Sequence, residues 1–141
     1  MTRPLKRGYR GSQATAAVRA LAALFAIAGL GHFVAPEFFE RILPPWLPGW
    51  LGVPRTVVYM SGMAELAGAA GLLIPATRVV AGWGLIALLV AVFPANVQML
   101  LDARASGAGR WYVAALWLRL PLQPLLIWWV WRLAVHGPRR V

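Results

Sequence analysis

The chain contains no cysteine and very little acid. Its 141 residues include 14 Lys and Arg against 4 Asp and Glu, which gives a formal net charge of +10. Without a thiol, the chain alone is excluded from disulfide exchange, thiol catalysis and iron–sulfur or zinc–thiolate chemistry. In a soluble protein a charge of this size would suggest nucleic-acid binding. The positions of the basic residues along the chain decide whether that interpretation applies here.

The apolar residues leave no room for a soluble basic domain. They make up 60% of the chain, charged residues make up 13%, and the mean hydropathy is +0.66. They come in runs of about 20, the length that crosses a bilayer. Because the basic residues lie at the ends of these runs, we expect them to set the topology and to contact anionic lipid head groups. Membrane lipids are therefore expected as partners, and nucleic acid is not.

Four such runs predict a single all-α domain over residues 1–141, an integral membrane four-helix bundle. The predicted helices cover about residues 14–35, 55–74, 79–101 and 111–134. A basic start followed by an alanine-rich segment is also typical of a signal peptide. We favour a membrane span, because the first run is long enough to cross a bilayer and no soluble mature domain follows it.

Small residues and one short turn predict how two of these helices pack. The second run contains Ser61, Gly62, Ala64, Gly68 and Gly71. Small side chains let helices approach closely in lipid, where packing rather than the hydrophobic effect joins them. The turn at residues 75–78 is so short that the second and third helices must form an antiparallel hairpin.

Four spans place both termini on the same side of the membrane. The terminus side then carries nine basic residues, Arg3, Lys6, Arg7, Arg10, Arg19, Arg78, Arg132, Arg139 and Arg140. The other side carries four, Arg41, Arg55, Arg104 and Arg110, beside Glu37, Glu40 and Asp102. Since an excess of Lys and Arg marks the cytoplasmic side, both termini are predicted to be cytoplasmic.

Residues 36–54 form a Pro- and Trp-rich connection between the first and second predicted helices. Phe38, Phe39 and Ile42 fall on one helical face, which predicts a short amphipathic turn lying in the membrane interface. The prolines that follow prevent a longer helix. Trp46 and Trp50 fit the aromatic belt at the membrane surface. Two interpretations stay open, a loop resting on the head groups and a lid over a cavity.

A carboxylate, Glu65, lies in the middle of the second apolar run. At that depth a charge costs several kcal/mol unless it is paired or neutralised. Counting about 1.5 Å per residue from the outer helix ends places His32 near ~5 Å, Asn96 near ~8 Å and Arg119 near ~12 Å. Glu65 and Gln123 both lie near ~16 Å. Four helices are thus predicted to send polar groups into one layer of the outer leaflet.

Three prolines fall in the same layer and are predicted to interrupt the third and fourth helices: Pro94, Pro121 and Pro124. Broken backbone at membrane depth is tolerated where protein or a water-filled cavity satisfies the freed carbonyls. Glu65 and Arg119 are predicted to pair. That pair serves either to hold the helices in register or to build a ligand or proton-linked site.

The remaining polar residues also have ordinary interpretations. For His32 this interpretation is an interfacial hydrogen bonder, and for Asn96 it is a side chain that only mends the helix near Pro94. Met60, Met63 and Met99 lie at a depth similar to that of His32 and resemble a set of soft copper ligands. Methionine is also common core filler, so copper is not expected. Haem is not expected either, because only His32 qualifies as an axial ligand.

Several short motifs resemble those of the DoxX-like family of small bacterial membrane proteins. They are Gly31-His32-Phe33 with Pro36, Ser61-Gly62 with Glu65, Phe93-Pro94-Ala95-Asn96, and Arg119-Leu120-Pro121-Leu122-Gln123. Their order spans about residues 20–133. The resemblance implies a compact four-helix membrane bundle. It also points to roles as different as thiosulfate oxidation with quinone as acceptor, redox-stress complexes and chaperoning of membrane receptors. The missing cysteines exclude the dithiol chemistry of thiol-handling relatives.

We therefore expect a protein of the bacterial inner membrane with an outward-opening pocket formed by His32, Glu65, Asn96, Arg119 and Gln123. The pocket is predicted to bind a small amphipathic molecule with a quinone-like headgroup, as in a redox-associated subunit. Arg119 would keep Glu65 ionised, Asn96 and Gln123 would hydrogen-bond the ligand, and His32 would pass a proton to the outer face. No residue is assigned a catalytic role.

The alternative hypothesis is a non-enzymatic accessory or assembly protein whose buried Glu–Arg pair is purely structural. Its partner would be a larger membrane complex, such as an oxidoreductase, or further copies of the same chain. A transporter or channel fits less well, because one copy has four short helices and a single polar layer confined to one leaflet.

Overall fold

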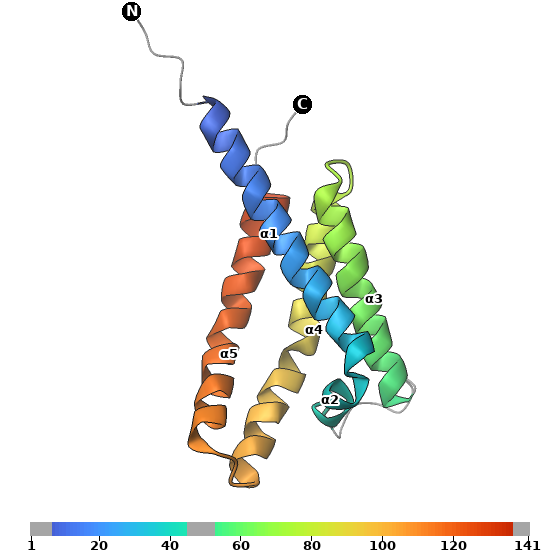
Figure 1. The fold of residues 1–141 in the computed structure, drawn as a ribbon, viewed down its shortest axis with the longest axis vertical. Coiled ribbons are helices and arrows are strands. Elements are labelled where there is room, and N and C mark those ends of the chain that lie inside the picture. Colours follow the sequence, from blue (N-terminus) through green and yellow to red (C-terminus); the bar gives the residue numbers. More distant parts are fainter. Residues whose placement is uncertain (1–6, 45–52, 137–141) are drawn as a thin grey trace, which may run out of the picture.

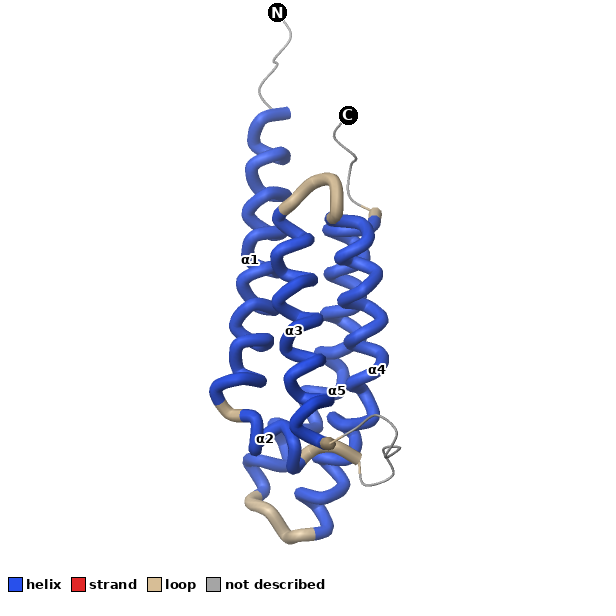
Figure 2. The backbone as a smooth tube through the Cα atoms, turned by 90° about the vertical axis from the view of Figure 1, so that its right-hand side faces the viewer, coloured by secondary structure: helices blue, strands red, loops and turns tan. Residues whose placement is uncertain are grey.

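The computed structural model describes residues 7–44 and 53–136, and within these ranges every regular element is a helix. The elements are α1 (Arg7–Val34), α2 (Pro36–Arg41), α3 (Pro54–Leu73), α4 (Arg78–Ala105), α5 (Arg110–Val130) and the π-helical turn η2 (Trp131–Val135). Figures 1 and 2 show the four long helices running alongside one another, with the short α2 near one end of the bundle.

Four of the helices are long and apolar enough to cross a membrane. The segments are Thr15–Val34, Pro54–Leu73, Arg78–Ala105 and Arg110–Val135. Only 33%, 28%, 28% and 17% of the most apolar window of these four segments, in chain order, is buried inside the protein. This exposure of apolar surface is what lipid contact requires. The prediction of an all-α protein with four membrane-length helices is confirmed.

The helices pack in the order α1, α3, α4, α5. α1 packs mainly against α3, α3 also packs against α4, and α4 packs against α5. α5 makes its main contacts with α4, and η2, which continues α5, also contacts α1. η2 and the α3–α4 turn lie at one end of the bundle, and α2 and the α4–α5 turn lie toward the other (Figure 1). We refer to these as the η2 end and the α2 end.

Close packing at the η2 end depends on glycine, as the small residues predicted. A Cβ added to Gly68 would collide with the Leu85 side chain, and one added to Gly82 would lie 2.7 Å from Ala134 Cβ. The side chains that fill this half are almost fully buried, among them Leu21, Leu72, Leu85 and Val130. The α3–α4 hairpin is present, and its turn is closed by Arg78 Nε, which donates to the Leu72 carbonyl at 2.8 Å.

The prolines do not interrupt the helices, so that prediction is wrong. α4 continues through Pro94, and α5 continues through Pro121 and Pro124. A proline removes one N–H, but its φ near −65° is helical, so the hydrogen bonds on either side can persist. α4 also extends past its predicted end to Ala105, and the expected polar loop shrinks to residues 106–109.

Candidate functional site

A cavity of about 390 Å³ lies in the half of the bundle toward the α2 end. Its walls come from all four long helices and from α2 with the residues that follow it. Most of the lining is apolar, and the polar or charged side chains that reach it are His32, Ser61, Glu65, Asn96 and Arg119. Four of the five predicted site residues therefore share one cavity.

Glu65 is paired with His32 across the α1–α3 interface. The Glu65 Oε2 and His32 Nδ1 atoms are 3.5 Å apart, and the two side chains are 13% and 11% exposed. His32 Nδ1 also lies 3.0 Å from the carbonyl oxygen of Ala28. Because a carbonyl only accepts, the Nδ1 proton is donated to Ala28. In the described part of the chain, Glu65 Oε2 is buried without any hydrogen-bond partner.

Glycine brings these two residues together. A Cβ added to Gly62 would lie 2.8 Å from His32 Cβ and 2.9 Å from the Gly29 carbonyl oxygen. A Cβ added to Gly29 would lie 2.9 Å from the Gly62 carbonyl oxygen and 3.1 Å from Glu65 Cβ. Only two glycines allow the backbones to approach this closely. The Gly29–Gly62 contact is therefore what places the imidazole beside the carboxylate.

The predicted Glu65–Arg119 pair is wrong. Arg119 lines the cavity, yet no carboxylate of the described residues lies within ion-pair distance of it. Its Nη1 instead lies 3.9 Å from the sulfur of Met99. The reason is the packing order, since α5 packs mainly on α4. Arg119 consequently reaches the cavity from α5, whereas Glu65 reaches it from α3.

The depth counted along each helix also misplaced His32 relative to Glu65. His32 is two positions before the end of α1, whereas Glu65 is eleven positions, or ~16 Å, after the start of α3. They can meet only because α1 ends inside the bundle. Counting from helix ends had assumed that every helix ends at the membrane surface. α2 follows α1 directly and lies toward the end of the bundle beyond it (Figure 1).

Asn96 and Gln123 form a second buried polar contact, between α4 and α5. Asn96 Nδ2 donates to Gln123 Oε1, and Gln123 Nε2 donates to the Leu89 carbonyl. Asn96 lines the cavity, but Gln123 does not, which corrects its predicted place in the pocket. Asn96 also does not mend the backbone at Pro94. The residue that bonds the α4 backbone near this proline is Gln123, which at the same time holds the Asn96 side chain.

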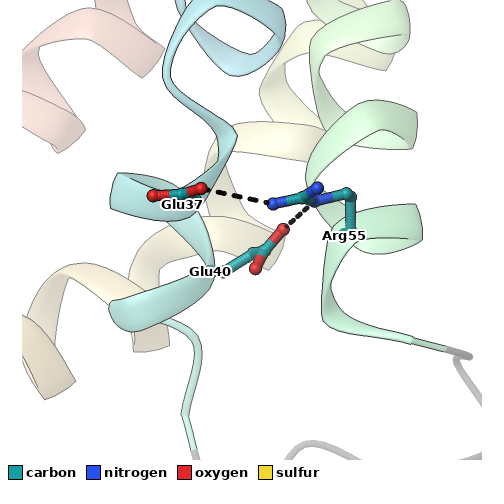
Figure 3. A network of polar contacts seen from close by, with 3 residues as sticks. All are labelled: Glu37, Glu40 and Arg55. Carbon is teal, nitrogen blue, oxygen red and sulfur yellow. Dashed lines mark hydrogen bonds and ion pairs between the residues drawn. The ribbon is translucent and has the colours of Figure 1, made fainter.

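Sequence reasoning missed the group of charges beside α2. Arg55 Nε lies 2.6 Å from Glu40 Oε1, and Arg55 Nη2 lies 3.9 Å from Glu37 Oε1 (Figure 3). These three residues were assigned to the same side of the membrane, and their opposite charges were the available signal. The short helix α2 lies where the sequence predicted an amphipathic turn. Trp46 and Trp50 lie outside the described residues.

The three methionines that resemble soft copper ligands in the sequence are differently placed. Met60 lines the cavity and is 66% exposed, Met63 is 59% exposed, and Met99 is buried at 5% beside Leu100 and Leu116. Among the described residues, no three His, Asp or Glu side chains gather as a metal site would need.

Residues 21–134 match a family described as a domain of unknown function, DUF8561. The chain belongs to this family. The DUF8561 match covers most of the 141-residue chain and encloses the His32–Glu65 pair and the Asn96–Gln123 contact. No curated protein and no solved structure matches the chain. The resemblance of this DUF8561 protein to the DoxX-like family stays a prediction.

Proposed function

We propose that this protein is a multi-pass protein of the bacterial inner membrane that binds a small amphipathic molecule in the cavity beside Glu65. The observation that carries this proposal is the Glu65 Oε2 atom, which is buried without a hydrogen-bond partner in the described structure. Leaving such an acceptor unsatisfied costs about 1–3 kcal/mol or more. A ligand that donates a hydrogen bond to this atom recovers that cost.

The size and lining of the cavity suit such a ligand. Its volume of about 390 Å³ falls in the lower part of the range of small-molecule pockets, about 300–1,000 Å³. Leu88 and Val92 of α4 and Val58 of α3 supply apolar walls. Pockets of this kind bind through apolar contact and use a few fixed polar groups to orient the ligand. The cavity therefore fits a flat polar headgroup that continues into an apolar tail.

A quinone-like headgroup fits the placement of the polar groups best. Arg119 has no carboxylate partner among the described residues, and as a donor it suits a carbonyl oxygen of the ligand. The Glu65 carboxyl group suits the hydroxyl of the reduced form. Asn96, held by Gln123, adds a third polar contact. A quinone-like ligand implies a redox-associated role, with His32 passing protons to and from Glu65 and with a larger membrane oxidoreductase as partner.

The proposal is tested by titrating decylubiquinone into the protein in lipid nanodiscs. The chain has 8 tryptophans, so quenching of their fluorescence reports a saturable complex. Glu65→Gln and Arg119→Leu are each expected to weaken binding about tenfold, which corresponds to the loss of one good polar contact. Asp102→Asn, an exposed acid outside this cavity, is the matched control and should bind normally. Unchanged binding in both cavity variants would overturn the proposal.

The proposed orientation places both termini in the cytoplasm. It is supported by the position of η2 and the α3–α4 turn at one end of the bundle (Figure 2), with Arg78 and Arg132 there. Excess basic charge belongs on the cytoplasmic side. A reporter fused to either end that fluoresces only in the cytoplasm should be active, and an inactive fusion would reverse the orientation.

A second candidate function, an accessory or assembly subunit, is favoured by the exposed surface of α5. α5 packs mainly on α4, and its outward face includes Trp117, Leu118, Leu122, Leu125 and Trp128. Such a surface suits a larger membrane complex or further copies of this chain. In that case the His32–Glu65 pair is purely structural. The double variant His32→Leu with Glu65→Leu should then stay folded and still copurify with its partner. Loss of copurification in this folded variant would exclude this candidate.

A further inference from the structure

α2 covers part of the cavity without being buried in the bundle. None of its residues, Pro36–Arg41, is buried. Phe39 of α2 lines the cavity, and so do the three residues that follow the helix, Ile42, Leu43 and Pro44. One face of this segment therefore closes the cavity while the rest of it remains exposed.

A single non-helical residue joins α2 to α1. α1 ends at Val34, α2 begins at Pro36, and Ala35 between them has φ −134° and ψ 56°. Proline has no N–H and disfavours the helical conformation in the residue before it, so Pro36 ends α1 at this point. Ala35 N still donates to the Gly31 carbonyl at 2.9 Å. A change of φ and ψ at Ala35 alone would thus move α2 while α1 stays in place.

Two contacts hold α2 against the bundle. On the cavity side, the Phe39 ring stacks on the His32 ring, with centroids 3.9 Å apart and planes inclined by 19°. On the outer side, Glu40 accepts a hydrogen bond from Arg55 Nε at 2.6 Å, and Glu37 lies beside the same guanidinium (Figure 3). The Arg55 side chain is 50% exposed. The Arg55–Glu40 pair joins α2 to the first turn of α3.

From these contacts we propose that α2 is a lid over the cavity, with Ala35 as its hinge and the Arg55–Glu40 ion pair as its latch. The lid admits molecules to the Glu65 cavity from the α2 end of the bundle. Exposed ion pairs are weak and are screened by salt, so the latch opens reversibly. The lid would regulate ligand entry and in that sense rests on the proposed function, but its opening is measurable without any ligand.

The missing cysteines allow a direct measurement of opening. Ser61 lines the cavity, so Ser61→Cys introduces the chain's single thiol there. Its reaction rate with N-ethylmaleimide, an uncharged reagent, reports access to the cavity. Adding Glu40→Gln or Arg55→Gln should raise this rate about twofold to fivefold, the size expected for loss of an exposed ion pair. Added salt should raise the labelling rate of Ser61→Cys when the Arg55–Glu40 pair is intact. It should not raise that rate when Glu40→Gln is also present.

Three controls separate the latch from general loosening of the fold. Asp102→Asn removes an acid elsewhere and should leave the Ser61→Cys rate unchanged. A thiol at Ala105→Cys, exposed at the end of α4, should react equally fast with and without the latch. The charge-swapped variant Glu40→Arg with Arg55→Glu, made together with Glu37→Gln so that Glu37 does not repel the new carboxylate, should return the rate toward that of the native latch, since the pair is restored with its polarity reversed.

Equal rates in Glu40→Gln, Arg55→Gln and the native latch would overturn the lid. So would a charge-swapped variant that labels as fast as the single variants. If Glu40→Gln and Arg55→Gln leave the labelling rate unchanged but decylubiquinone binding still depends on Glu65, the lid is wrong and the proposed function stands. If the rates respond and decylubiquinone does not bind, the lid stands and the quinone-like ligand is wrong.

Discussion

The two halves of the bundle are built differently. At the η2 end, Leu21, Leu72, Leu85 and Val130 are at most 1% exposed and fill the space between the helices. At the α2 end, the helices enclose a cavity of about 390 Å³ with a buried carboxylate and imidazole beside it. The same four helices thus form a packed core in one half and a candidate binding site in the other.

The difference follows from where the helices end. At the η2 end, η2 continues α5 and packs against α4 and α1, which closes the bundle. At the α2 end, α1 stops at Val34, and the exposed α2 takes the place of its next turns. A cavity therefore arises where one helix is replaced by a weakly held segment. Stability is expected to depend on the η2 half and ligand binding on the α2 half.

The largest effect on stability is expected from Leu85→Ala in the η2 half. Leu85 is 1% exposed and packs against Gly68, so the variant leaves a cavity in the core. A loss of about 2–5 kcal/mol in the free energy of unfolding is expected. Circular dichroism during denaturation in detergent would measure it. Leu101→Ala, at a position 51% exposed on the same helix, should change little, and equal losses would contradict the division into halves.

A smaller loss of stability, joined to a loss of binding, is expected for Gly62→Ala. The new Cβ would lie 2.8 Å from His32 Cβ and 2.9 Å from the Gly29 carbonyl oxygen, so α1 and α3 must separate. Overpacking of this kind costs about 1–3 kcal/mol. Decylubiquinone binding should weaken as His32 moves from Glu65. Gly84→Ala, with nothing within 4 Å of the new Cβ, should be neutral or slightly stabilising.

Gln123→Leu should weaken binding without touching the cavity wall. It removes the acceptor for Asn96 Nδ2 and the donor to the Leu89 carbonyl, at a cost of about 1–3 kcal/mol. Asn96 is then free to turn, so decylubiquinone affinity should fall by less than in Glu65→Gln. Gln98→Leu, whose partner Asp102 is exposed, is the control. If Gln123→Leu binds decylubiquinone with normal affinity, the Asn96–Gln123 contact serves only to pack α4 against α5.

The smallest effect on stability is expected for Glu40→Gln in the lid. Its contact with Arg55 is exposed, so the unfolding midpoint should stay within experimental error of the native value. Thiol access to the cavity should change nonetheless, as described above. A clear drop in the midpoint would show that α2 is part of the structural core, and the contrast between the two halves would then be lost.

Part of the candidate site was predictable from the sequence because membrane burial makes polar residues conspicuous. Glu65, His32, Asn96 and Arg119 were expected to share a pocket, and all four line the cavity. Their pairing was not predictable, because it depends on which helices are neighbours. His32 meets Glu65 through the Gly29–Gly62 contact, whereas Arg119 lies on α5, which packs on α4.

Composition and the length of the apolar runs were by themselves enough to determine an all-α chain with four membrane-length helices, because a bilayer leaves the backbone few other ways to satisfy its hydrogen bonds. Only the tertiary structure decided that the prolines stay within continuous helices, that α1 ends inside the bundle, and that His32 rather than Arg119 lies beside Glu65. These features depend on contacts of a few ångströms between residues far apart in the chain, and no local pattern of residue types encodes such distances.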